Sequence, residues 1–322
     1  MPRRPAPLPA SLGDAFRTAA GREQGVSRAR LGASDLEAPF HGVRVRSAPA
    51  VLAPDGPDDP FARGRLAREL ELRRARAYAP LLTASAFFTG RTAAILYGLP
   101  LDPGDDLDVG VIAPSRAPRG RGVRGVKVEG HLVRLREFEG LRLSSPASTW
   151  AMLGRELSVR ELVIVGDAIV RIPRGRSGTP FPEARQATHA QLGSAVDAGP
   201  RRGIAHLRTA LPLIREGSMS PLETAFRLDG AEAGLPPADL DGEIRDASGR
   251  LLGISEFVYR AHRVVVEIEG DHHRTSRAQW NRDLDKYAAY AAAGWEVVRV
   301  TSSHLRQGRA VGLVRAALDR HR

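Results

Sequence analysis

The chain has no cysteine, which excludes disulfide bonds and thiolate-bound metals. It also has no apolar run approaching the length of a bilayer span, and its arginine- and proline-rich start leads into no hydrophobic signal core. We therefore expect a cytoplasmic protein with no membrane partner. Lysine is almost absent as well, because Lys127 and Lys286 are the only two, so nearly all of the positive charge is arginine.

The balance of charge is strongly basic. The 322 residues carry a net charge of +11, and the sequence pI is near 10.9. Such a balance attracts polyanions, and the planar guanidinium of arginine is the better bidentate ligand for phosphate. GC-rich coding also favours arginine, and it accounts for part of the excess. The composition is consistent with DNA as a partner but does not by itself establish it.

A short segment near residue 267 carries the strongest chemical signal. Residues 264–268 read as a strand with period two, so Glu267 and Glu269 should lie on the same face as Val265. A strand this rich in valine and isoleucine is typically buried on both faces, and a buried carboxylate is costly unless it is paired or binds a cation. Mg²⁺, which is held by carboxylates, water and phosphate oxygens, suits this arrangement.

A third acid lies on the preceding strand, where pairing could bring Glu256 beside Glu267. A different interpretation is that Glu267 and Glu269 are ordinary strand residues paired to arginines. His273, in the loop after Gly270, is either a solvated loop residue or a catalytic group.

The chain divides on sequence into three parts of mixed α/β character. Residues 1–53 predict two short helices, over 14–20 and 27–31, followed by a strand. This order resembles a winged helix-turn-helix with Arg28 and Arg30 on the recognition helix, and a small structural cap is the alternative. A linker rich in proline, glycine and aspartate precedes a middle domain at 61–199, whose helix around Trp150 reads as core.

The last part, residues 201–322, predicts a mixed sheet with flanking helices in the order helix, three strands, helix, strand, helix. After a helix predicted over 201–213, the helix that precedes the three strands begins at Ser220-Pro221, with serine as the N-cap and proline at the first helical position. Glu223 then has two interpretations. It is the capping partner at the third helical position, or an acid delivered to a metal site.

The last part resembles the domain-of-unknown-function 559 family, which is similar to very-short-patch-repair endonucleases of the PD-(D/E)XK superfamily. Upstream, residues 89–100 and 145–150 resemble actinobacterial proteins that join an AbiEi-like antitoxin region to this nuclease-like domain, in which the winged helix binds DNA. The motifs of the last part are Ser220-Pro221-Leu222-Glu223, Glu256 before Glu267-Ile268-Glu269-Gly270-Asp271-His272-His273, Arg282-Asp283 and Gly294-Trp295-Glu296-Val297-Val298-Arg299.

The resemblance implies an endonuclease that uses Mg²⁺, with Mn²⁺ as an alternative ion. Its implied metal ligands are Glu256, Glu267 and Glu223, its catalytic residues are Glu256, Glu267, Glu269 and His273, and Arg274 and Arg282 join Arg28 and Arg30 as DNA contacts. Aspartate is usual in the family at the positions of Glu256 and Glu269. The lysine that usually follows the second acid is absent, so His273 or a metal-polarised water would replace it.

Three functions from different classes follow. The first is a Mg²⁺-dependent DNA endonuclease, and the second is a DNA-binding, antitoxin-like regulator whose nuclease fold has lost its chemistry. The third is a protein-interaction scaffold, for which a toxin or another protein would be the partner. Metal-dependent cleavage separates the first from the second, and only the third predicts no affinity for DNA.

Overall fold

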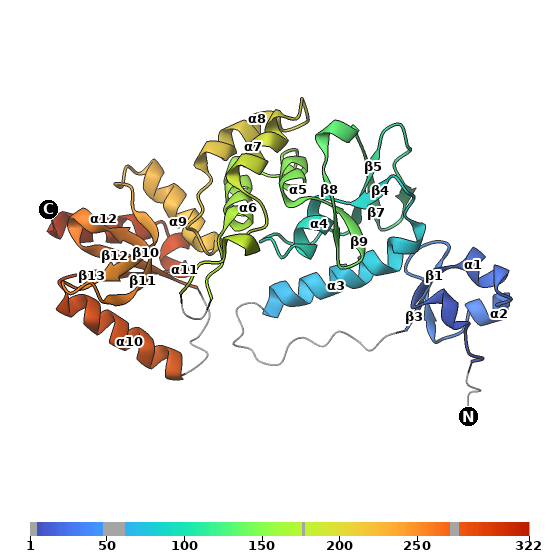
Figure 1. Cartoon of the computed structure of the whole chain (residues 1–322), viewed down its shortest axis with the longest axis horizontal. Helices are drawn as coiled ribbons and strands as arrows, with labels where there is room; N and C mark the ends of the chain where they lie inside the picture. The colour runs from blue at the N-terminus through green and yellow to red at the C-terminus, as the bar shows by residue number, and fades with distance from the viewer. Residues whose placement is uncertain (1–4, 48–61, 176–177, 271–276, 322) are drawn as a thin grey trace. The chain divides into compact units, whose positions relative to one another are not determined.

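The computed structural model describes residues 5–47, 62–175, 178–270 and 277–321 (Figure 1). Of residues 277–283 only the backbone is described. The chain has a mixed α/β fold, as predicted, and three sheets form within the described residues. Its contacts form two compact units, the first from residues 5–47, 62–153 and 194–201 and the second from 154–193 and 202–321. Residues 154–193, which the sequence groups with the middle domain, therefore belong to the same compact unit as residues 202–321.

The N-terminal segment has a small sheet of order β1-β3-β2 around two short helices. The predicted helix over 14–20 is wrong at its start, because residues 15–17 form a strand that pairs with β3 and buries Phe16. Gly21 lies inside α1, against the Phe16 ring. The elements are β1 (Ala15–Arg17), α1 (Thr18–Glu23), α2 (Arg28–Leu31), β2 (Leu36–Glu37) and β3 (Val43–Arg46).

The rest of the first unit is built on a six-stranded sheet of order β6-β7-β5-β4-β9-β8. Trp150 is fully buried, as predicted for a core residue. The strands are β4 (Ala86–Phe88), β5 (Leu107–Ile112), β6 (Arg119–Gly120), β7 (Val123–Val128), β8 (Leu135–Phe138) and β9 (Leu141–Ser144), and the helices are α3 (Ala62–Tyr78), α4 (Gly90–Leu96) and α5 (Pro146–Leu153).

Helices at the start of the second unit hold α9 (Pro221–Glu232) in place. Buried Asp167 on α6 (Val159–Val170) accepts hydrogen bonds from the Thr224 hydroxyl and the Arg227 guanidinium, at 2.8 and 2.7 Å, and both donors lie on α9. A buried carboxylate satisfied in this way fixes the two helices against each other. The neighbouring helices are α7 (His189–Asp197) and α8 (Ile204–Ala210).

The second unit ends in a four-stranded sheet of order β10-β11-β12-β13. The predicted element order is confirmed: β12 and β13 are parallel, and α10 is the crossover between them. In Figure 1, α10 lies on one side of this sheet and α12 on the other. The elements are β10 (Asp239–Arg245), β11 (Leu251–Tyr259), β12 (Val264–Glu269), α10 (Arg277–Ala292), β13 (Glu296–Thr301), α11 (Ser302–Arg306) and α12 (Ala310–Arg320).

The period-two interpretation of β12 is confirmed by the two cores of this sheet. Val264 and Val266 pack in the cluster that includes Val314 of α12, whereas Val265 packs with Tyr290 of α10. Glu267 therefore points to the α10 side, where the site described below lies. Among the helices of the described ranges, none is both long and apolar enough to cross a bilayer.

Candidate active site

The first acid of the site is placed by the start of α9. Ser220 caps the helix by accepting a hydrogen bond from the Glu223 backbone N–H, and the Glu223 carboxylate accepts one from the Met219 N–H at 2.7 Å. Glu223 is 3% exposed. Burial raises its pKa to about 6, and the charges of Asp241 and Glu267 add to the rise against the opposing hydrogen bonds. Glu223 thus bonds the backbone at the start of α9 and also lies beside the acids Asp241, Glu256 and Glu267.

The second acid lies where two strands separate. The β11–β12 ladder ends at Phe257 and Val266, and beyond it the Glu256 carboxylate accepts the Ile268 N–H that a regular ladder would pair. Burial raises the pKa of Glu256 to about 9. The charges of Glu223 and Glu267 add to this rise, whereas the Ile268 N–H and Lys286 oppose it. The structure therefore brings Glu256 and Glu267 together, as the sequence suggests.

The third acid is paired with a lysine from α10. The Glu267 Oε1 atom accepts hydrogen bonds from Lys286 Nζ at 2.7 Å and from the Ser255 hydroxyl at 2.8 Å. Lys286 also donates to the Ile254 carbonyl at 3.0 Å, and the Ser255 hydroxyl is 3.1 Å from the Tyr290 hydroxyl. The Glu267 and Lys286 side chains are 10% and 22% exposed, so most of the pair is removed from water.

Lys286 is the site residue that the sequence reasoning missed. The sequence has no lysine on the strand after the second acid, and the Lys286 ammonium instead reaches Glu267 from the crossover helix α10. Gly253 makes room for it, because a Cβ atom there would lie 2.5 Å from the Tyr290 hydroxyl and 3.0 Å from the Lys286 side chain. The sequence does contain a signal for the role of Lys286, because it is one of only two lysines in a chain that otherwise uses arginine.

The remaining predicted residues lie in different settings. Glu269 forms an ion pair with Arg299 on β13, which is the arginine pairing that the alternative interpretation expects. Arg30 is held by a bidentate ion pair with Asp35 at 2.7 and 2.8 Å, whereas Arg28 on the same helix is exposed. His273 and Arg274 lie outside the described residues, as does the side chain of Arg282.

The donor set of the acidic cluster fits a hard divalent cation. Glu223, Glu256 and Glu267 provide only oxygen ligands, and the pKa values of the first two are raised by burial first and by the charges of neighbouring acids second. Within the described ranges, however, no three histidine or acidic side chains are already arranged to hold a metal ion. The carboxylate oxygens of these three residues instead accept hydrogen bonds from Lys286, Ser255 and backbone N–H groups.

Comparisons with known proteins identify relatives without a described activity. No family model matches the chain. It is 28% identical over 235 residues to "Uncharacterized protein MT2308" of Mycobacterium tuberculosis strain CDC 1551 / Oshkosh and to "Uncharacterized protein Rv2248" of strain H37Rv, covering 72% of this chain and 80% of each relative. The crystal structure of the RV2827C protein from Mycobacterium tuberculosis matches 68% of this chain and 80% of that chain with a TM-score of 0.34 and 16% identity. The function must therefore be argued from the site.

Proposed function

We propose that the protein is a cytoplasmic DNA endonuclease that depends on Mg²⁺, with Mn²⁺ as an alternative ion. The observation that supports this proposal is the largely buried Lys286–Glu267 pair beside Glu223 and Glu256. Removing such ions from water costs several kcal/mol each, and apolar residues of similar volume often stabilise a fold as well or better. A cluster of acids with raised pKa values around a lysine is therefore better explained by chemistry than by stability.

Each residue of the cluster has a role in this proposal. Glu223, Glu256 and Glu267 are the residues that would hold the cation, which would supply Lewis-acid stabilisation of phosphate charge. Lys286 is a compact cation suited to a phosphate oxygen. Ser255 donates to the same Glu267 oxygen as Lys286 and so fixes the orientation of that carboxylate. Hydrolysis of a phosphodiester needs charge stabilisation of this kind around the reacting phosphate.

The basic chain and its N-terminal segment support DNA as the substrate. The net charge is +11, and exposed Arg28 lies on the second short helix of a winged-helix-like arrangement. Binding that neutralises phosphates releases counterions, so we expect affinity for duplex DNA to fall steeply between roughly 50 and 200 mM salt. A flat salt response in an anisotropy titration would contradict the assignment of DNA as the partner.

A second candidate function is a DNA-binding, antitoxin-like regulator that has lost its chemistry. The observation that favours it is the state of Glu256, whose carboxylate is held by the Ile268 N–H and has a pKa raised to about 9. At neutral pH this acid would carry a proton and would be a poor metal ligand. Such a regulator would act through DNA or through a toxin or another protein partner, and it would bind DNA without cutting it.

Plasmid nicking with purified full-length protein tests the proposal. Wild type should nick supercoiled plasmid with Mg²⁺ or Mn²⁺ and not with chelator. Glu267→Gln should remove nicking because the amide keeps the shape and loses the charge. Lys286→Met should lower the rate by about 10²- to 10³-fold, as loss of a preorganised charge-stabilising group does. The matched control is Glu243→Gln on β10, whose carboxylate pairs with Arg245 outside the acidic cluster. This variant should keep full activity.

The outcomes separate the two candidates. Equal nicking by wild type and Glu267→Gln would mean that the site does not cleave DNA. Glu256→Asp restores the residue usual in the resembling family and should leave activity level or raise it. Nicking by this variant alone would favour the regulator with a degenerate site. DNA binding should be nearly unchanged in all of these variants.

A further inference from the structure

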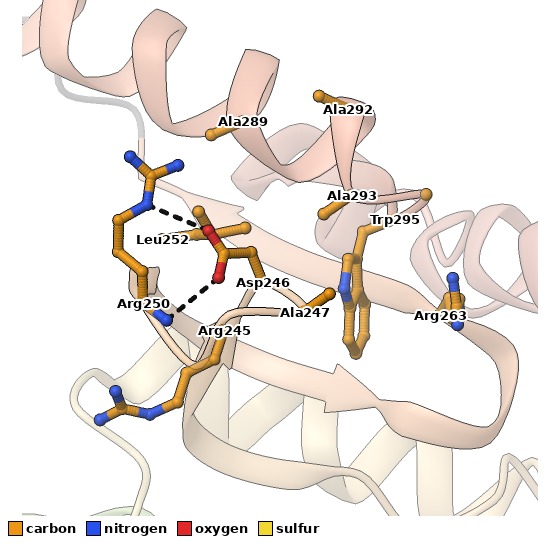
Figure 2. Close-up of a pocket in the computed structure, with 11 residues that line it drawn as sticks. Arg245, Asp246, Ala247, Arg250, Leu252, Arg263, Ala289, Ala292, Ala293 and Trp295 are labelled. Atoms are coloured by element: carbon orange, nitrogen blue, oxygen red, sulfur yellow. Dashed lines mark hydrogen bonds and ion pairs between the residues drawn. The ribbon is translucent and has the colours of Figure 1, made fainter.

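A cleft lies on the α10 side of the C-terminal sheet, outside the acidic cluster (Figure 2). Its volume is about 750 Å³, within the range of ligand pockets in proteins. The walls come from the β10–β11 turn, from Arg263 before β12, from the end of α10 and from Trp295 before β13. None of these residues belongs to the acidic cluster around Glu267.

The cleft is basic. Three arginines and one aspartate line it, which leaves a formal charge of +2. Asp246 is used within the turn, where it accepts hydrogen bonds from Arg250 Nε at 3.0 Å and from the Ser248 N–H at 2.9 Å. Arg245 is bonded to the Gly249 carbonyl and to Glu243. Within the described residues, the Arg263 guanidinium has no hydrogen bond or ion pair and is exposed, so it is available to an anion.

An aromatic surface accompanies this charge. Trp295 packs on the apolar cluster formed by Ile244, Val265 and Tyr290 but remains partly exposed, and it lines the cleft. In Figure 2 its indole stands between Ala247 and Arg263. The end of α10 and the residue after it line the cleft with short side chains only, namely Ala289, Ala292 and Ala293.

A purely structural explanation covers only part of this arrangement. Arg263 lies by the end of α10, where a cation offsets the helix dipole, and a Cβ atom on Gly294 would be 3.2 Å from its Nη1 atom. Offsetting the helix dipole needs only one arginine. It explains neither the open cleft nor the partly exposed indole of Trp295. Guanidinium groups beside an aromatic face are the groups that bind a phosphate and stack a base.

We propose that this cleft binds one nucleotide, with its phosphate at Arg263 and its base against Trp295. This assignment rests on the proposed function. The nucleotide belongs to the cleaved DNA strand and lies to one side of the phosphodiester that is hydrolysed. The positions agree with this, because Ala292, which lines the cleft, lies six residues after Lys286 on α10, which is about 9 Å along the helix axis. That distance corresponds to roughly three stacked nucleotides of one strand.

Binding without cleavage tests the proposal. All proteins are full-length and carry Glu267→Gln, so that DNA stays intact, and the probe is a fluorescein-labelled single-stranded oligonucleotide followed by anisotropy. Trp295→Leu should weaken binding by about five- to a hundred-fold, as loss of one stacking side chain does, and Trp295→Phe should restore most of it. Arg263→Gln should weaken binding by at least fivefold. Arg208→Gln, an exposed arginine on α8, makes the same charge change away from the cleft.

The outcomes are independent of nuclease activity. Equal affinities for Arg263→Gln and Arg208→Gln, or an unchanged affinity for Trp295→Leu in protein with normal circular dichroism and melting, would overturn the site. Thymidine monophosphate, with inorganic phosphate as the control, is titrated into the same proteins. The free nucleotide should also bind more weakly to Trp295→Leu and to Arg263→Gln than to the Arg208→Gln control, and equal binding by all three would likewise overturn the site.

Discussion

Replacement of Glu256 by glutamine should remove a pH dependence of stability that its burial creates. An acid with a raised pKa in the folded state stabilises the fold fully below its unfolded pKa, near 4.3, and loses that contribution as pH rises through the folded value, here about 9. Between these limits the folded protein binds one more proton than the unfolded chain. The free energy of unfolding should therefore fall with rising pH.

The magnitude follows from one proton. A full proton changes stability by about 1.4 kcal/mol per pH unit, so wild type should lose about 2.7 kcal/mol between pH 5.5 and 7.5 through this group. For a unit of this size, that loss lowers the melting temperature by roughly 5 to 10 °C. Glu256→Gln keeps the hydrogen bond from the Ile268 N–H through its amide oxygen and has nothing to ionise. Its melting temperature should depend less on pH by this amount.

Thermal melts in chelator, at matched ionic strength and at several pH values, measure the difference. Glu243→Gln is the control, because its carboxylate lies in the same sheet but is 42% exposed beside Arg245. It should keep the wild-type slope. The same slope for wild type and Glu256→Gln would mean that Glu256 is ionised in the folded protein, and the account of a buried, charge-repelled acid would be refuted.

Other variants test separate parts of the structure. Lys286→Met should destabilise the second unit by about 2 to 3 kcal/mol in urea, below the full cost of breaking a buried pair because the lysine is 22% exposed; a change under about 0.5 kcal/mol would contradict the pairing. Trp150→Ala should cost about 3 to 5 kcal/mol by the same measurement, and unchanged melting with loss of DNA binding would instead make it an interface residue. Arg30→Ala should destabilise the N-terminal segment by about 1 to 2 kcal/mol, whereas Arg28→Ala should leave melting unchanged and weaken binding of duplex DNA in anisotropy.

Local patterns predicted much of the C-terminal unit. The period-two pattern of residues 264–268 predicted β12 and its two faces. The Ser220-Pro221 start predicted α9, with Glu223 in its first turn. These features depend on neighbours in sequence, so they can be read from it. Residues 15–17 were predicted as helix because their preference for strand comes from pairing with β3, which lies far along the chain.

Features that depend on tertiary contacts were not predicted. Lys286 reaches Glu267 only because α10 crosses the sheet, and no spacing rule links residues 19 positions apart. Residues 154–193 contact the C-terminal part because Asp167 binds α9, which is also a long-range contact.

Calorimetric titration of Mn²⁺ into the full-length protein tests the central claim most directly. If Glu223, Glu256 and Glu267 form a cation site, wild type should bind the ion near neutral pH and release protons, because Glu256, with a pKa raised to about 9, must ionise first. The measured heat should then differ between two buffers of different ionisation enthalpy, and Glu267→Gln should bind at least tenfold more weakly. Absence of Mn²⁺ binding by wild type up to millimolar concentration, or equal binding by Glu267→Gln, would contradict the account.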